Sequence, residues 1–170
     1  MEVNELMPVA GHDAVIGTAL AAMEDVRART IAAIDGLSDT YMDAVAPGYP
    51  NTIGATLYHI AAVEADWLYA DMLERDYPQW FGEWFPFDVR EEGGKLSPAP
   101  GFSFENHLAR LAKVREHFLE DMTGFDPARF RSHNGVTENP STPQWIFHHL
   151  TQHEAEHRGQ IQAVRTLLEA

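Results

Sequence analysis

The sequence predicts an all-α protein, a four-helix bundle formed by a single domain that spans residues 1–170. Three observations lead to this prediction. Apolar residues recur at the spacing of an amphipathic helix in four long stretches, which proline- and glycine-rich segments separate. No stretch alternates apolar and polar residues over the length of a useful strand. A chain of 170 residues also suits one domain with a substantial buried core.

The first two predicted helices lie in the N-terminal half of the chain. One extends over about residues 12–36 and carries its apolar residues on one face. The following connection, residues 38–51, contains a Pro-Gly-Tyr-Pro run that no helix would cross. We expect the next helix to begin with Asn51 or Thr52 as its N-cap and to extend to about Asp76. Its apolar stripe consists of Ile53, Leu57, Ile60, Val63 and Trp67.

The third and fourth predicted helices lie in the C-terminal half. The third opens with Ser103 and extends to about Met122, with large apolar residues on one face. The fourth occupies residues 141–170, and it begins with a hydroxyl residue followed by Pro143, a typical helix start. Residues 123–140 are predicted to form turns and surface.

The connection over residues 77–101 is long and aromatic. A connection of this length in a compact domain is usually functional or packed on itself. Its rings could dock on the bundle, as large aromatic residues mostly do. Alternatively, Trp80, Trp84 or Phe85 could cover a functional pocket or a dimer interface. The aromatic residues are Tyr77, Trp80, Phe81, Trp84, Phe85 and Phe87.

Composition excludes several classes of protein. The net charge of −14 and the absence of any Lys/Arg cluster argue against a nucleic-acid partner. The chain has no cysteine, so disulfides, thiolate metal sites and cysteine nucleophiles are excluded. No apolar run approaches the roughly 20 residues that span a bilayer, and the first residues are acidic without an apolar signal core. We therefore expect a cytoplasmic protein with no membrane partner.

Two histidines occupy positions of the fourth helix where leucines are expected. The apolar seam of residues 141–170 is continuous only if His153 and His157 belong to it. An i, i+4 pair lies on one helix face with Cβ atoms about 6 Å apart. Burying an unpaired polar group costs roughly 1–3 kcal/mol, so a metal ion bound by both rings is a simple explanation.

A third histidine, His59, lies at the edge of the apolar stripe of the second helix. Histidine is the commonest metal ligand, and three protein ligands with a vacant position are typical of catalytic sites. We therefore predict one metal ion bound by His59, His153 and His157. The alternative is a set of core histidines that bond to Glu154, Glu156 or backbone carbonyls. His149 is expected either behind the metal ligands or at the pocket wall. The remaining histidines are expected to be solvated or singly hydrogen-bonded; they are His12, His107, His117, His133 and His148.

The carboxylates show no comparable pattern. Asp66 lies on the face of His59 and could point to the pocket or to solvent. Glu64 and Glu154 are displaced around their helices and are expected at the surface or behind the histidines. A repeated Glu-x-x-His motif is missing, which disfavours a di-iron carboxylate bundle. The His-Glu-Ala-Glu-His run over residues 153–157 is similar to a zincin motif, but no sheet accompanies it.

Two segments resemble the signatures of the DinB/YfiT-like family. One is His-Leu-Thr-Gln-His-Glu-Ala-Glu-His-Arg-Gly-Gln-Ile, residues 149–161, and the other is Thr-Leu-Tyr-His-Ile-Ala-Ala-Val-Glu-Ala-Asp-Trp, residues 56–67. The resemblance covers essentially the whole chain in order and length. It implies an up-down-down-up four-helix bundle and one divalent ion, zinc, nickel or iron, held by His59, His153 and His157. It also implies a homodimer.

Family resemblance narrows the expected chemistry. Characterised relatives include thiol S-transferases and a thiol-dependent isomerase, which implies a metal-dependent enzyme that transfers a low-molecular-weight thiol to an electrophilic small molecule. The absence of cysteine means that such a thiol must come from solution. Arg158 or Gln160 could orient the substrate or be structural. A metal-assisted hydrolase and a non-catalytic bundle that binds a metal or a small molecule remain alternatives.

Overall fold

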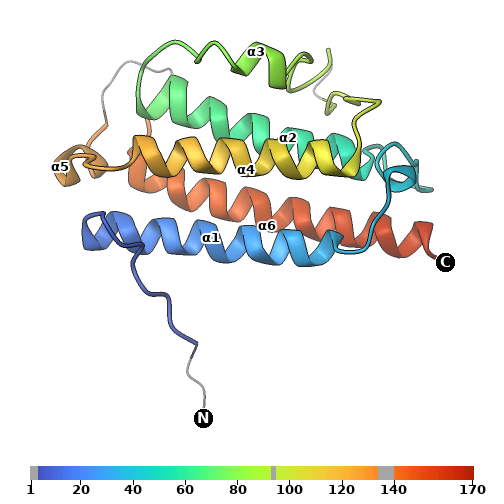
Figure 1. The fold of residues 1–170 in the computed structure, drawn as a ribbon, viewed down its shortest axis with the longest axis horizontal. Helices are drawn as coiled ribbons and strands as arrows, with labels where there is room; N and C mark the ends of the chain where they lie inside the picture. The colour runs from blue at the N-terminus through green and yellow to red at the C-terminus, as the bar shows by residue number, and fades with distance from the viewer. Residues whose placement is uncertain (1–3, 93–94, 134–139) are drawn as a thin grey trace.

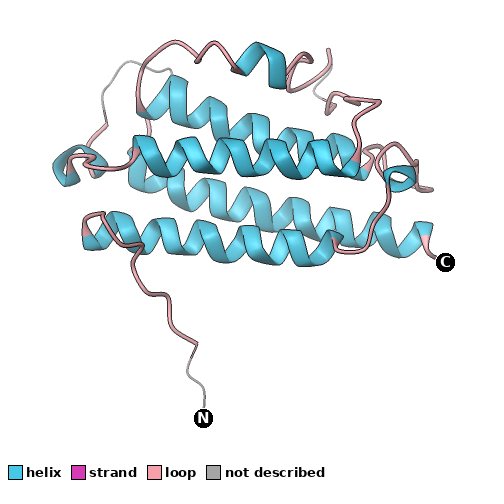
Figure 2. Cartoon of the chain, viewed as in Figure 1, coloured by secondary structure: helices cyan, strands magenta, loops and turns pink. Residues whose placement is uncertain are grey.

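Four long helices make up most of the computed structural model, which describes residues 4–92, 95–133 and 140–170. Within these residues the only β-type pairing is an isolated bridge between Arg90 and Leu96, so the all-α prediction is confirmed (Figure 2). The long helices are α1 (Ala14–Ile34), α2 (Ile53–Asp66), α4 (Phe104–Asp121) and α6 (Pro143–Leu168).

Four short helical segments complete the regular structure. They are the 3-10 turn η1 (Asp39–Tyr41), the π-helical turn η2 (Trp67–Met72), α3 (Phe81–Trp84) and α5 (Pro127–Phe130). Because η2 continues α2, the second helix ends at Met72, earlier than the predicted end near Asp76. The two predicted connections, residues 77–101 and 123–140, each contain one short helix; part of the second, residues 134–139, lies outside the described residues.

The helices follow an up-down-down-up order (Figure 1). In that view α1 and α6 run in one direction, whereas α2 and α4 run in the other. Two consecutive helices can be parallel only if the chain returns along the bundle between them. The aromatic connection does this, and α3 lies along the outside of the bundle within it (Figure 1).

Side-chain caps fix where the long helices begin. The hydroxyl of Thr52 accepts the N–H of Ala55, and the hydroxyl of Thr142 accepts the N–H of Trp145. Ser103 and Asn106 form a reciprocal capping box at the start of α4. Each of these caps satisfies donors that a helix leaves free at its first turn. The predicted starts at Thr52, Ser103 and the Thr142–Pro143 pair therefore match the structure.

The most buried long helix is α2. It packs on both α4 and α6, while α1 packs on α6. Of its 14 residues, all except Val63 and Asp66 are buried. A side chain on the α6-facing side of α2 therefore meets the seam of α6 inside the bundle. No helix in the described part of the chain is both long and apolar enough to cross a membrane.

Candidate metal centre

Three histidines from two helices converge between α2 and α6. Nε2 of His153 lies 3.1 Å from Nε2 of His59 and 3.1 Å from Nε2 of His157. One possible ligand atom from each ring lies within 4.8 Å of the other two. Zn²⁺ bound tetrahedrally at 2.0–2.1 Å would hold its nitrogen ligands about 3.3 Å apart, close to these separations. The structure thus brings together the three residues that the sequence analysis selected.

The helices themselves place the rings. His153 and His157 are one turn apart on α6, so their rings project side by side. His59 faces them from α2 and is only 1% exposed, whereas the two α6 rings are half-buried. The cluster therefore lies at the edge of the core, shielded on the α2 side and accessible from the α6 side.

Burial favours the neutral, metal-binding form of these rings. It lowers the pKa of His153 to about 3 and that of His59 to about 4, with smaller contributions from neighbouring histidines and from Arg90. Burial also lowers the pKa of His157, although its bond to Gln160 opposes the change. Because a metal ion binds neutral imidazole, all three rings are ready to act as ligands at neutral pH.

The protons of the three neutral rings cannot satisfy all of the nitrogens that face one another in the cluster. His157 donates its Nδ1 proton to Oε1 of Gln160, 3.0 Å away, so its Nε2 carries only a lone pair when the ring is neutral. The single proton on Nε2 of His153 can serve only one of its two 3.1 Å neighbours in regular geometry. A cation at the point that the three nitrogens share would satisfy all of them, so these residues fit a metal ion.

Aromatic residues form the wall on one side of the cluster. The ring of His149, one turn before His153, stacks on Trp145 with centroids 5.1 Å apart and meets the edge of Trp67. Its centroid is 5.9 Å from that of His153. His149 is therefore held by aromatic packing beside the site.

The connection between η2 and α4 adds a positive charge that the sequence analysis missed. Tyr58, next to His59, donates its hydroxyl proton to the backbone oxygen of Phe87 (2.6 Å) and accepts the N–H of the same residue (3.0 Å). Three residues further along the chain, Arg90 lies near enough to lower the pKa of all three histidines. No periodicity could have revealed this, because an irregular segment brings Arg90 to the site.

The comparison with protein families agrees with this architecture. The family model described as the DinB superfamily matches residues 22–161, which cover most of the chain and all three histidines. The chain belongs to the DinB superfamily. No curated protein matches the sequence.

Three carboxylates of this DinB domain that the sequence singled out, Asp66, Glu64 and Glu154, bind partners other than the three histidines. Asp66 accepts a hydrogen bond from the hydroxyl of Tyr77, so it fastens the aromatic connection to α2. Glu64 and Glu154 are each only 2% exposed, which rules out the surface positions that were one expectation for them. Both bind buried arginines, because the four helices meet in an ionic cluster that the sequence pattern does not show.

The aromatic rings of the connection mostly pack on the DinB bundle. Trp80 stacks on His117 of α4 with centroids 4.8 Å apart, and the ammonium group of Lys113 lies over both Trp80 and Trp84. Phe85 is buried against Tyr58. The rings of Trp80, Trp84 and Phe85 therefore dock on the bundle, which was one of the two alternatives for this connection. Whether they also lie at a dimer interface stays a prediction.

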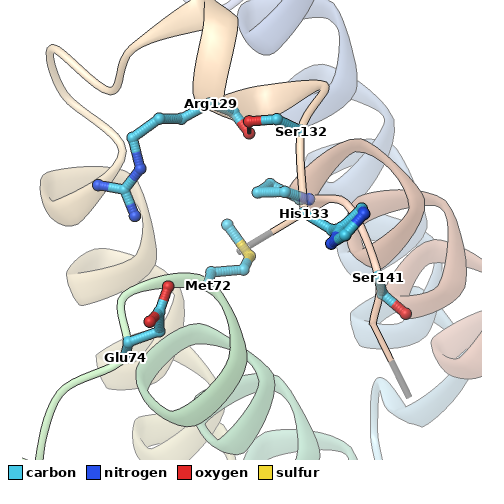
Figure 3. Close-up of a pocket in the computed structure, with 7 residues that line it drawn as sticks. Met72, Glu74, Arg129, Ser132, His133 and Ser141 are labelled. Atoms are coloured by element: carbon cyan, nitrogen blue, oxygen red, sulfur yellow. Dashed lines mark hydrogen bonds between the residues drawn. The ribbon is translucent and has the colours of Figure 1, made fainter. Parts of the chain in front are cut away.

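A cavity of about 120 Å³ lies where η2 ends and α6 begins, and Figure 3 shows the residues around it. Its walls come from the end of η2, from α5 and the residues after it, and from the start of α6. It contains His133, but none of the three clustered histidines lines it. The cavity and the cluster are separate features. The labelled residues are Met72, Glu74, Arg129, Ser132, His133 and Ser141.

Proposed function

We propose that the chain is a metal-dependent enzyme that joins a low-molecular-weight thiol to an electrophilic small molecule. The observation that carries the proposal is the convergence of His59, His153 and His157 on one point at the edge of the core. A divalent ion bound there, zinc, nickel or iron, would lower the pKa of a thiol or a water at its remaining position toward neutrality.

The residues of the chain would divide the work. The three histidines hold the ion through neutral nitrogens, and Gln160 keeps His157 turned toward it through the bond to Nδ1. Arg90 contributes a positive charge beside the site, which favours an anionic sulfur there. In the transfer the thiol would lose its proton to solvent water, the sulfur would form a bond to carbon, and the leaving group would depart with its electron pair. The chain has no cysteine, so the sulfur comes from solution.

Metal content and thiol transfer in matched variants test the proposal. We expect about one divalent ion per chain in the wild type, and loss of that ion in His59→Ala, His153→Ala and His157→Ala. His148→Ala, an exposed residue of the same helix, should keep the ion. The wild type loaded with zinc, nickel or iron should then join small thiols to monochlorobimane, and His153→Ala should not.

The same experiments can contradict each part separately. Full metal content in any two of the three histidine variants would refute the metal site. A metal-loaded protein that forms no thiol conjugate would refute the transferase activity. Hydrolysis by activated water or a binding role without catalysis would then explain the site better.

A further inference from the structure

A cavity of about 250 Å³ lies next to the histidine cluster. Its walls include Tyr49, Pro50 and Asn51 from the connection before α2, Thr56 on α2, and Gln160 and Val164 on α6. The two helices that contribute to its walls are those that carry the three histidines.

The register of the two helices places the cavity one turn from the cluster. Thr56 precedes His59 by three residues on α2, and Gln160 follows His157 by three residues on α6. Because α2 and α6 run in opposite directions, both steps lead toward the same end of the bundle (Figure 1). Three helical residues advance about 4.5 Å. Gln160 both lines the cavity and bonds to His157, so the cavity and the cluster share a wall.

The walls of the cavity are uncharged but able to form hydrogen bonds. Within the described residues, the hydroxyl of Tyr49 and the amide of Asn51 have no hydrogen-bond partner. The hydroxyl of Thr56 donates to the backbone oxygen of Thr52, 2.8 Å away, and can still accept a hydrogen bond from a ligand. The cavity is open to solvent on one side, since Tyr49 and Asn51 are half-buried and Gln160 is exposed, so a ligand can enter it and bond to these polar groups. The volume is below the range of about 300–1,000 Å³ usual for drug-sized ligands, so the group it takes is small.

We propose that this cavity receives the uncharged, hydrogen-bonding body of the thiol while the sulfur lies at the histidine cluster. Asn51 and Tyr49 are then the residues that determine which thiol binds. This inference rests on the proposed function, because it assigns a place to the rest of the same cosubstrate. An alcohol or an amide group two carbons from the sulfur has the required chemistry, whereas an ammonium or a carboxylate group does not.

The test compares three thiols that differ only in the group at the far end. 2-Mercaptoethanol, cysteamine and 3-mercaptopropionate are titrated into the cobalt-loaded protein, and the sulfur-to-cobalt charge-transfer band reports binding without requiring turnover. Asn51→Asp adds one negative charge to the cavity wall with little change in size. A charge pair about 5 Å apart is worth roughly a fourfold change in affinity even when water screens it. The affinity for cysteamine relative to 2-mercaptoethanol should therefore rise at least about fourfold, and that for 3-mercaptopropionate should fall.

Matched variants separate the possible outcomes. Gln162→Glu adds the same charge to α6 at an exposed residue away from the cavity walls and should leave the three affinities in their wild-type ratio. Tyr49→Phe removes one hydroxyl and should weaken 2-mercaptoethanol binding about two- to twelvefold, the range for one lost hydrogen bond. This second variant decides the matter if Asn51→Asp does not fold.

Two results would overturn the inference in different ways. A charge-transfer band in the wild type, with unchanged ratios in Asn51→Asp and unchanged affinity in Tyr49→Phe, removes the cavity from thiol binding but leaves the proposed function standing. No band with any thiol removes the proposed function, and this inference with it.

Discussion

His107, a residue of α4, shows how burial changes the properties of a single side chain. It is 1% exposed, and its Nε2 has no hydrogen-bond partner among the described residues. Its Nδ1 lies 3.3 Å from the guanidinium group of Arg110. A Cβ atom at position 54 would lie 3.0 Å from that Nε2, so Gly54 leaves the space the ring occupies. Burial and, to a smaller extent, the charge of Arg110 lower the pKa of His107 to about 4, although Asp43 opposes the change.

This depressed pKa makes a prediction about acid stability. An unfolded histidine takes up a proton near pH 6.5, whereas folded His107 does so only near pH 4. Protonation of His107 therefore does not reduce the free energy of unfolding above pH 6.5, but it reduces it progressively as the pH falls from about 6.5 to about 4. As the pH is lowered, we expect the free energy of unfolding to fall less steeply in His107→Gln than in the wild type. The two slopes should differ by up to about 1.4 kcal/mol per pH unit.

Urea denaturation of metal-free protein at pH 7, 6 and 5 measures that slope. His148→Gln, which changes an exposed histidine, is the control and should follow the wild type. Equal slopes for the wild type and His107→Gln would show that His107 does not titrate in the way its burial implies.

At the scale of elements, the connection between η2 and α4 is fastened to the bundle at specific points. The two hydrogen bonds between Tyr58 and Phe87 hold it beside α2, and the segment after Phe87 carries Arg90 to the histidines. Further along, Leu96 is 6% exposed and Ala99 is fully buried. Although this connection has no long helix, its contacts with the bundle hold Arg90 beside the three histidines.

Removing the Tyr58 hydroxyl should release this segment. Tyr58→Phe loses both bonds to Phe87, so we expect the free energy of unfolding to fall by about 1–3 kcal/mol, the value of two hydrogen bonds. Trypsin should then cut after Arg90 faster than in the wild type, as mass spectrometry of timed digests would show. Tyr41→Phe is the matched control, because the Tyr41 hydroxyl has no partner among the described residues. Identical digestion of all three proteins would contradict the fastening role.

At the scale of the whole molecule, a buried ionic cluster joins the four long helices. Arg27 of α1 bonds to Glu154 of α6 (2.8 Å) and to Glu64 of α2 (2.5 Å). Arg115 of α4 bonds to Glu64 at 2.7 Å and, at the rim, to Glu24. Burial alone would raise the pKa of Glu64, but Arg115 and Arg27 hold it below the ordinary value. Because each long helix supplies one buried charge, the cluster favours one arrangement of the bundle.

Breaking this cluster should cost far more than breaking an ion pair at the surface. Arg27→Met leaves two buried carboxylates short of a partner, so we expect a loss of about 3–5 kcal/mol in the free energy of unfolding. Arg29→Met, two residues later on the same helix, breaks an exposed pair with Asp25 and should cost less than about 1 kcal/mol. Urea titration of both variants makes the comparison, and similar losses would refute the special role of the buried cluster.

The sequence was most informative where the type of residue and its spacing along a helix could be used together. Apolar spacing and hydroxyl caps located the four long helices, because both are local properties of the chain. His153 and His157 were recognised because two polar residues stood on an apolar seam of one helix. The end of the second helix was not predicted correctly. Its last turn, η2, is π-helical and ends at Met72, and Glu74 just beyond it has a positive φ of 51°; the apolar stripe encodes neither feature.

Family membership, helix class and the three histidines could thus be determined from the sequence alone, since each depends on residue type and spacing. Only the tertiary structure decided which surfaces of different helices meet. It placed Arg90 beside the histidines, buried Glu64 and Glu154 against arginines from α1 and α4, and formed the cavity between Asn51 and Gln160. The physical reason is that these contacts join residues far apart in the chain, and their partners are chosen by the packing of whole helices and not by any local pattern.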